Sequence, residues 1–350
     1  MGLFALIAII VGGIVLVRSR PDTDQSITGQ APLRDHEVGR LFDQPLPGLS
    51  QRRSTPTATG NARADARIRD VAFARGYQLR VEALYPMGTY QGRRLQQRAI
   101  DDLVDLQAAM FEEVGVRLTL TSAHRSAVRQ RGLFLAQINS SSLRLRGRLV
   151  TNNEIALGLA DDVLNNAMLI AAPPGFSRHH TGLTIDVSSQ GFASFNFANS
   201  TAYRWLTENR YSNAMAYGWV ASYPPGAAAQ GPNPEPWEWV WIGRDAAECA
   251  AARTCATGGV DAVSTGVIGW AINADRAPIG RFRLLTANGT RALKLEAVSR
   301  YDVAVALGLT EAEVGFAGSQ TLPASARWAC VEAQTSAGGP WNPVGCMQAG

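Results

Sequence analysis

The stretch "PGFSRHHTGLTIDVS", residues 174–188, places a serine, two histidines and an aspartate around a glycine turn. Its second half, "LTIDVS", alternates as a short strand does, and Gly182 supplies the turn before it. His179 and Asp186 lie seven residues apart. The turn can therefore bring an imidazole nitrogen and a carboxylate oxygen to one ion, which zinc binds at about 2.0–2.2 Å. A polar loop with a cap and a surface aspartate fits the same residues, and this stretch alone leaves both interpretations open.

A second stretch, "EPWEW" at residues 235–239, opens the aromatic segment "WEWVWIG". In a strand, Glu238 shares one face with Val240 and Ile242, while the tryptophans share the other. Neither face readily holds a charge, since a buried carboxylate needs a cation, a metal ion or a shifted pKa. Glu238 is therefore either an unusual carboxylate without a functional role or a ligand.

Helix and strand patterns surround these stretches. The periodicity predicts helices at about 95–114, 127–138, 154–170 (one helix or a pair) and 200–218. It predicts strands at 116–122, 183–188, 219–223 and 237–243. Residues 21–64 are polar and aperiodic, which predicts a solvated linker. Residues 258–350 carry short apolar runs and Gly-rich turns, which predict a small all-β domain.

The N-terminal segment, residues 1–20, contains the uncharged run "LFALIAIIVGGIVLV". This run is short for a spanning helix, so a signal sequence and a membrane anchor are equally compatible with it. Its arginines follow the run rather than precede it, and we leave the topology open. A formal net charge of +4 suits an anionic surface such as cell wall. No dense run of Lys and Arg points to nucleic acid.

The four cysteines form two close pairs, Cys249 with Cys255 and Cys330 with Cys346. A paired, even count is typical of disulfides in an oxidising compartment, and buried thiols are the alternative. A zinc knuckle is disfavoured because neither pair has C-x-x-C spacing. Together with the N-terminal segment, the cysteines predict an extracytoplasmic protein of the cell envelope, either membrane-anchored or secreted.

Three ordered motifs resemble those of VanY-type D-alanyl-D-alanine carboxypeptidases, which are LAS/hedgehog-type zinc peptidases. The first stretch is similar to S-x-H-x-x-G-x-A-x-D, with Thr184 in place of Ala. "TSAHRSAVRQ", residues 121–130, is similar to S-x-Y-R-S-x-x-x-Q, with His124 in place of Tyr. "EPWEW" aligns with E-P-W-H-W. The resemblance covers about 65–245 and implies an α+β domain, bounded here as 65–248, with a central antiparallel sheet.

The resemblance also implies the site. Zinc would be held by His179, Asp186 and the residue at position 238, with Glu235 as the general base for a metal-bound water. The terminal carboxylate and backbone of the substrate would be bound by Arg125, Ser126, Gln130 and Ser177. Arginine suits this role because its planar fork pairs with a carboxylate through two hydrogen bonds. The implied activity is a zinc D,D-carboxypeptidase acting on D-Ala-D-Ala-type stem peptides of peptidoglycan, although an endopeptidase also fits.

One departure concerns Glu238, which stands where the family has a histidine. The chain has four histidines. His36 lies in the predicted linker and His180 should point away, so His124 is the only other histidine that could move in, although it is on the substrate side. Glu238 is therefore the best candidate for the third ligand. A glutamate ligand makes the site less positive, so it would activate water less. Oxygen ligands also admit Mn²⁺ more readily. The sequence thus predicts a retuned metallopeptidase, and the alternative is a degenerate protein that binds wall peptide without cutting it.

Other hydrolase classes lack support, because no H-E-x-x-H, G-x-S-x-G or Walker motif occurs. The C-terminal part resembles an accessory module of secreted actinobacterial proteins through "STGVIGWAINADR", "EVGFAGSQTLP" and "RWACVEAQ". Asn273 and Tyr301 depart from that pattern. The resemblance implies a small β-sandwich that either targets the wall or merely stabilises the enzyme.

Overall fold

The computed structural model describes residues 56–80, 86–226, 231–252, 254–263, 266–286, 289–319, 328–335 and 341–348. The predicted N-terminal segment, His36 and most of the predicted linker lie outside these residues. Within the described part of the chain, no helix combines the length and the apolar character that a membrane crossing requires. The membrane anchor and the envelope location therefore stay predictions.

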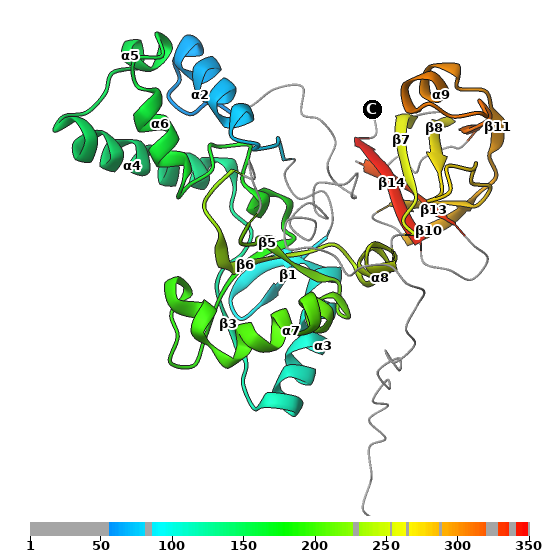
Figure 1. Cartoon of the computed structure of the whole chain (residues 1–350), viewed down its shortest axis with the longest axis horizontal. Helices are drawn as coiled ribbons and strands as arrows, with labels where there is room; N and C mark the ends of the chain where they lie inside the picture. The colour runs from blue at the N-terminus through cyan, green and yellow to red at the C-terminus, as the bar shows by residue number, and fades with distance from the viewer. Residues whose placement is uncertain are drawn as a thin grey trace, which may run out of the picture. The chain divides into compact units, whose positions relative to one another are not determined.

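Helices and strands alternate up to α8, and the elements after it are mostly strands (Figure 1). The helices are α2 (Ala62–Ala74), α3 (Gln97–Val114), α4 (Ala127–Arg146), α5 (Asn152–Ala156), α6 (Asp161–Met168), α7 (Thr201–Met215), α8 (Arg244–Ala252) and α9 (Tyr301–Leu307), with 3-10 turns η2 (Arg178–Thr181) and η3 (Ser194–Asn199). The first strands are β1 (Met87–Tyr90), β2 (Arg93–Gln96), β3 (Leu118–Ser122), β4 (Thr184–Ser189), β5 (Trp219–Tyr223) and β6 (Glu235–Trp241). The later strands are β7 (Thr257–Val263), β8 (Gly266–Ile272), β9 (Phe282–Thr286), β10 (Gly289–Leu293), β11 (Glu296–Val298), β12 (Gly315–Ser319), β13 (Trp328–Gln334) and β14 (Trp341–Gln348).

The central sheet is antiparallel, with strand order β3-β4-β6-β5, as the resemblance implied. All four strands predicted from the sequence are present. Ile185 lies opposite Trp239, and Asp186 lies opposite Glu238. Because side chains alternate along a strand, the first pair faces one side of the sheet and the second pair faces the other. The alternation of "WEWVWIG" therefore separates an aromatic core face from a polar face.

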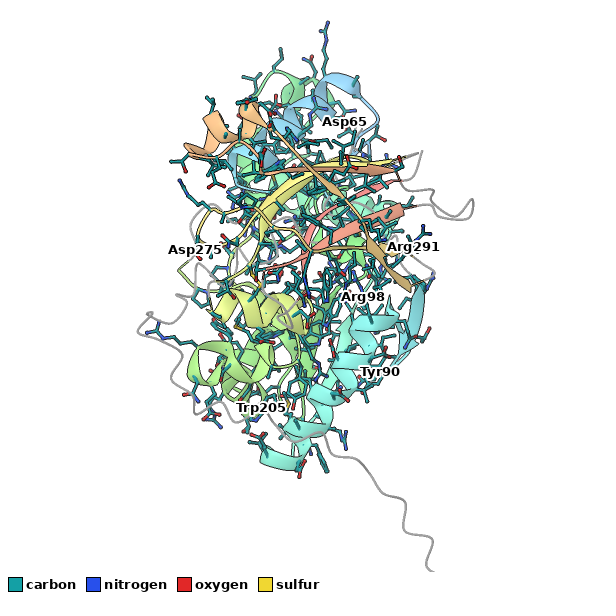
Figure 2. All side chains as sticks on the ribbon, turned by 90° about the vertical axis from the view of Figure 1, so that its right-hand side faces the viewer. Asp65, Tyr90, Arg98, Trp205, Asp275 and Arg291 are labelled. Carbon is teal, nitrogen blue, oxygen red and sulfur yellow. A yellow bond between two sulfur atoms is a disulfide. The ribbon has the colours of Figure 1, made fainter. Side chains whose placement is uncertain are left out.

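The core face packs on α3 and α7, which lie together on one side of the sheet in Figure 1. Helix α3 turns Leu103, Leu106 and Met110 inward at helical spacing. It ends at Gly115, as predicted, whose φ of 68° is a left-handed value that glycine adopts without strain. Trp205 of α7, labelled in Figure 2, is buried in this core and donates its indole N–H to Glu113 at 2.9 Å.

Helix α7 differs from the continuous helix predicted at 200–218. Residues 208–211 leave helical geometry, and Asn209, Arg210 and Tyr211 have φ values of 46°, 59° and 70°. This backbone is costly for residues other than glycine. The break is held by core contacts, because the buried Tyr211 ring lies 6.1 Å from the Trp239 ring. The Asn213 side chain also donates to the Trp205 carbonyl at 2.9 Å.

A second apolar cluster joins α2, α4, α5 and α6, on the other side of the sheet from α3 and α7 (Figure 1). Helix α4 runs eight residues past its predicted end at 138, to Arg146, and the predicted 154–170 segment is a pair of short helices. Helix α2 was not predicted, and it begins at Ala62, inside the predicted linker. Its Asp65 (Figure 2) accepts the N–H groups of Ala58 and Thr59 at 3.2 and 2.7 Å, which ties the preceding turn to the helix.

The C-terminal module is β-rich, as predicted. It has two antiparallel sheets, with strand orders β10-β9-β13-β14 and β11-β12-β8-β7. Phe282 of the first sheet and Phe316 of the second pack with ring centroids 4.5 Å apart, so the sheets share a core as in a sandwich. The short helix α9 was not predicted.

The cysteines follow the predicted pairing as far as the described residues reach. Cys249 of α8 forms a disulfide with Cys255. Cys330 is disulfide-bonded and lies directly opposite Cys346 in the β13–β14 register. The side chain of Cys346 lies outside the described residues.

Candidate metal centre

His179 is placed on the polar face of the sheet by the turn η2. The turn ends at Gly182, whose φ of 68° reverses the chain into β4. The ring nitrogen Nδ1 of His179 lies 2.6 Å from the carbonyl oxygen of Ala123. Since a carbonyl only accepts, Nδ1 carries a proton, and the other nitrogen, Nε2, is the one that can bind a metal.

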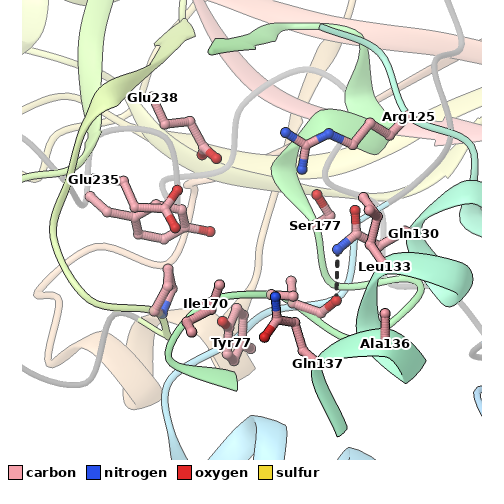
Figure 3. A pocket seen from close by; sticks show the side chains of 14 residues that line it. Tyr77, Arg125, Gln130, Leu133, Ala136, Gln137, Ile170, Ser177, Glu235 and Glu238 are labelled. Atoms are coloured by element: carbon pink, nitrogen blue, oxygen red, sulfur yellow. Dashed lines mark hydrogen bonds between the residues drawn. The ribbon is translucent and has the colours of Figure 1, made fainter. Parts of the chain in front are cut away.

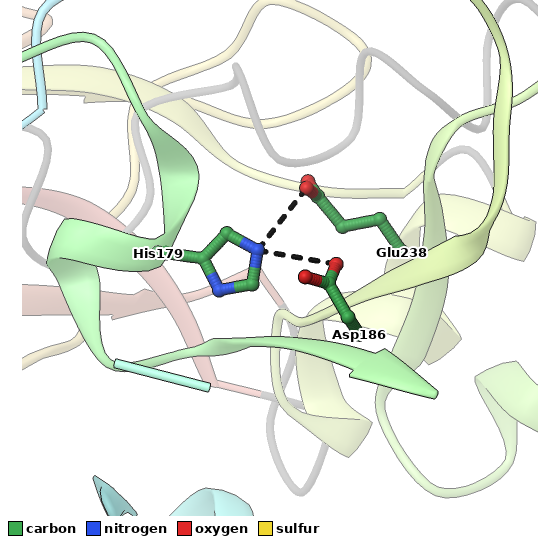
Figure 4. A group of neighbouring side chains, drawn as sticks. All are labelled: His179, Asp186 and Glu238. Atoms are coloured by element: carbon green, nitrogen blue, oxygen red, sulfur yellow. Dashed lines mark hydrogen bonds and ion pairs between the residues drawn. The ribbon is translucent and has the colours of Figure 1, made fainter. Parts of the chain in front are cut away.

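Asp186 and Glu238 converge on that nitrogen from adjacent strands (Figure 4). Asp186 Oδ1 and Glu238 Oε2 each lie 3.2 Å from His179 Nε2. One donor atom from each of the three buried residues lies within 4.8 Å of the others, which is the spacing of a metal-ligand set. Among the residues that the structure describes, this is the single such group. The donors fit a divalent ion, because imidazole nitrogen and carboxylate oxygen both bind zinc.

His180 points away from this group, as expected. Its Nε2 accepts the N–H of Gly175 at 3.0 Å, and its Nδ1 donates to the carbonyl of Arg125 at 2.7 Å. His124, the other histidine among the described residues, does not belong to the metal-ligand group either. Glu238 is therefore the third donor in the structure.

The charged groups of the site stabilise one another's ionised forms. Burial favours neutral His179, but Asp186 and Glu238 outweigh this effect and raise the pKa of the imidazole to about 9. Burial also opposes ionisation of Glu238, and hydrogen bonds from His179 and Ser222 reverse this, lowering the pKa of its carboxyl to about 2. Burial, with the nearby charges of Glu238 and Asp186, raises the pKa of Glu235 well above its usual value. A carboxyl with a raised pKa suits general acid–base chemistry.

Arg125 lines the pocket (Figure 3) and also contacts Asp186 of the metal-ligand group. Its guanidinium pairs with Asp186 Oδ2 and donates to Ser122 Oγ at 2.8 Å. The side chain keeps 18% of its surface exposed, so it remains accessible from the pocket. The sequence motif did not foresee that the predicted substrate-binding arginine also touches a predicted metal ligand.

The pocket has a volume of about 270 Å³, and its polar lining includes Arg125, Gln130, Ser177, Glu235 and Glu238 (Figure 3). Gln130 is buried and donates its amide to the Ala172 carbonyl at 2.8 Å. Its buried amide oxygen has no hydrogen-bond partner among the described residues. The rest of the lining is mainly apolar: Tyr77, Leu133, Ala136, Gln137, Ile170, Ala171, Ala172, Tyr223 and Pro232.

Ser126 is the predicted substrate-binding residue that does not line this pocket. It is exposed, and its hydroxyl accepts the N–H of Arg129 at 3.3 Å, which caps the start of α4. Its substrate-binding role stays a prediction.

Sequence reasoning missed several residues around the centre. Tyr77 follows α2 outside any motif, and its hydroxyl donates to the Met168 carbonyl at 2.6 Å. Ser222 and Tyr223 end the predicted strand 219–223. Alternation along that strand places Ser222 on the face of Val220, toward Glu238, and this signal was available in the sequence.

The comparisons with known proteins locate the likeness in one part of the chain. Residues 92–244 match the family model described as VanY: D-alanyl-D-alanine carboxypeptidase. No curated protein matches the chain.

Solved structures match at low identity. VanYB in complex with D-alanine-D-alanine is 24% identical, covering 48% of this chain and 83% of that one, with a TM-score of 0.37. The LdcB LD-carboxypeptidase is 26% identical, covering 49% and 70%, with a TM-score of 0.35. A mutant of the VanY D,D-pentapeptidase from a VanB-type resistance cassette, in complex with Zn(II), is 24% identical, covering 47% and 84%, with a TM-score of 0.36. The likeness to VanY-type carboxypeptidases is thus carried by residues 92–244, which are similar to that family's model.

Proposed function

We propose that this protein is a zinc-dependent D,D-carboxypeptidase that hydrolyses D-Ala-D-Ala-type stem peptides of peptidoglycan. The observation that carries the proposal is the convergence of His179, Asp186 and Glu238 beside a pocket that also holds Glu235 and Arg125. The family match to residues 92–244 supports the class of reaction.

Zinc is the ion that the proposal favours, because the donors are one imidazole and two carboxylates. Mn²⁺ is the second choice, since oxygen donors predominate. Bound there, the ion would supply a Lewis acid and a water with a lowered pKa. His179 would bind through Nε2 while its Nδ1–H stays on the Ala123 carbonyl.

The chain's own residues supply positioning and proton transfer. Glu235, at the edge of the pocket, would take a proton from the attacking water and pass it to the leaving amine. Arg125 would hold the terminal carboxylate of the peptide, and Gln130, which lies in the pocket lining, would contact the peptide backbone. Ser177 lies in the same lining and would add a hydroxyl contact.

A second candidate is a wall-binding protein without turnover. One observation favours it: Asp186 and Glu238 are already paired with cationic partners, Arg125 and His179. A site that satisfies its own charges can persist without metal, and the pocket could still bind a peptide end.

Metal content and product release separate the two candidates. The full-length chain, purified in detergent, is analysed for bound metal and assayed for D-Ala release, alongside Glu235→Ala and Glu238→His. We expect wild type to hold metal and release D-Ala, Glu235→Ala to hold metal and release almost none, and Glu238→His to remain loaded. Wild type that holds metal but releases nothing supports the binding protein. Wild type without metal or release overturns the enzyme.

Location is part of the proposal. We infer an extracytoplasmic, membrane-anchored or secreted protein from the apolar run at 3–17 and the disulfide of Cys249 and Cys255. Cell fractionation with protease accessibility tests this, and a chain found only in the cytoplasm would refute it.

A further inference from the structure

The third donor, Glu238, is held on the side away from His179 by a buried series of hydrogen bonds. The hydroxyl of Ser222 donates to Glu238 Oε1 at 2.5 Å. Arg178 in turn donates from Nη1 to Ser222 Oγ at 3.0 Å, and also to the Ser222 backbone carbonyl. All three residues are at most 5% exposed, so water does not compete with these bonds.

The chemistry of the three side chains fixes which group donates and which accepts in each of these hydrogen bonds. A guanidinium only donates and stays charged, so the Ser222 oxygen accepts from Arg178. The hydroxyl hydrogen of Ser222 is then directed to the carboxylate, which only accepts. Glu238 Oε1 is thereby occupied, while Oε2 is the oxygen that lies 3.2 Å from His179 Nε2, where the donors converge.

Arg178 is itself fixed in place. It lies in the turn η2, one residue before His179, and its guanidinium sits 4.3 Å from the centroid of the Tyr223 ring. The turn that positions the imidazole therefore also positions the arginine behind the carboxylate. Each of the two carboxylate donors is linked to an arginine. Asp186 contacts Arg125 directly, and Glu238 is hydrogen-bonded to Ser222, which in turn accepts from Arg178.

We infer that Ser222 and Arg178 are positioning residues that make Glu238 a one-oxygen metal ligand, with Oε2 toward the ion and Oε1 on Ser222. The inference rests on the proposed metal site and deepens it. A glutamate is longer and more flexible than an aspartate, and it can bind a metal through one oxygen or both. Holding one oxygen removes that freedom, and the cation behind Ser222 offsets the negative charge that glutamate brings to the site.

The test measures zinc affinity by competition with a chromophoric chelator, on full-length wild type and Ser222→Ala. We expect the variant to bind zinc about 10- to 100-fold more weakly, the usual effect of removing a group that orients a ligand. Bound Co²⁺ supplies a spectroscopic signature, because its visible absorption changes in energy and intensity when a carboxylate goes from one bound oxygen to two.

Two controls separate positioning from general damage. Ser142→Ala removes another fully buried serine hydroxyl, which donates to the Ile138 carbonyl at 2.7 Å within α4, and it should leave zinc affinity unchanged. In a Glu238→Ala background, Ser222→Ala should change zinc affinity less than about two-fold, since the group through which it acts is gone. Thermal unfolding of the metal-free proteins checks that each variant folds.

The outcomes are distinct. Wild type that binds no zinc or Co²⁺ overturns the proposed function, and this inference with it. Wild type that binds zinc while Ser222→Ala binds equally well and gives the same Co²⁺ spectrum overturns the inference alone. An equal loss of affinity with and without Glu238 also overturns it, because Ser222 would then act through the fold rather than through the ligand.

Discussion

Replacing Arg125 with alanine should have two separable effects, because this side chain touches both a candidate ligand and the pocket. In the metal-free protein the change leaves Asp186 buried without its guanidinium partner. Removing one member of a buried ion pair costs about 3–5 kcal/mol. The Arg125 and Asp186 side chains keep 18% and 11% of their surface exposed, so we expect a value near the low end of that range.

The effect on substrate follows from the charge of the peptide end. Hydrogen bonds to a charged group contribute about 1.5–3 kcal/mol each, so losing the contact to a terminal carboxylate should raise KM about 10- to 100-fold. A peptide whose C-terminus is amidated lacks that charge, and its KM should change little. Arg125→Lys keeps a charge for Asp186 but lacks the planar fork, so it should restore stability more than it restores KM.

The assay follows release of the C-terminal residue from matched peptides ending in a free carboxylate or an amide. The stability of each metal-free variant is measured by urea unfolding. Arg129→Ala is the matched control, because Arg129 is an exposed arginine in the first turn of α4, and it should match wild type in both measurements. An equal loss of activity on both peptides would remove the carboxylate assignment of Arg125, and an unchanged free energy of unfolding would refute the account of its ion pair.

Three further outcomes are expected. Glu235→Gln should retain zinc, lose about 10²- to 10⁴-fold in kcat and lose the acid limb of the pH–rate profile. That limb arises because the base is lost as pH falls through the pKa of Glu235 in the metal-loaded site; zinc loss in this variant would make Glu235 a ligand instead. Zinc affinity should rise with pH up to about 9, where metal-free His179 gives up its proton. Calorimetry in buffers of different ionisation enthalpy should detect the proton released on binding. A zinc affinity that does not change with pH would contradict this. Replacing both Cys249 and Cys255 with serine should lower the free energy of unfolding by about 2 kcal/mol, as expected for so short a loop, and an unchanged midpoint in denaturant would refute it.

Local patterns in the sequence predicted the central sheet well. Strict alternation in "WEWVWIG" and "LTIDVS" identified β6 and β4, and Gly115 marked the end of α3. Helix α2 was missed because it lies beside a polar linker of similar composition, and its stability comes from packing on α5 and α6. The break in α7 was missed for the same kind of reason, since the contact of Tyr211 with Trp239 joins distant parts of the chain.

The residues of the candidate site also fall into those that the sequence predicted and those that it did not. The motifs named His179, Asp186 and Glu238, and the structure brings them together. The partners of those residues could not be inferred from motifs, because the Ala123 carbonyl and the Arg125 guanidinium are brought to the site by the register of β3 against β4. Register depends on the whole sheet, so the sequence predicted which donors meet but not what orients them.

The charges around the donors argue that the centre is suited to a divalent ion even with a glutamate in place of histidine. Without metal, Arg125 and protonated His179 balance Asp186 and Glu238, and burial beside these carboxylates raises the pKa of Glu235 and favours its neutral form. Binding a divalent ion through Nε2 would require His179 to give up its proton, and the added positive charge would favour the ionised form of Glu235. Metal binding would thus be coupled to proton release from the buried site. An ionised Glu235 is the carboxylate that a general base requires, so metal binding would also favour the active form of the base. A third histidine would leave the loaded site more positive. Glu238 therefore weakens the activation of water at the centre but does not remove the capacity of the centre to bind a divalent ion.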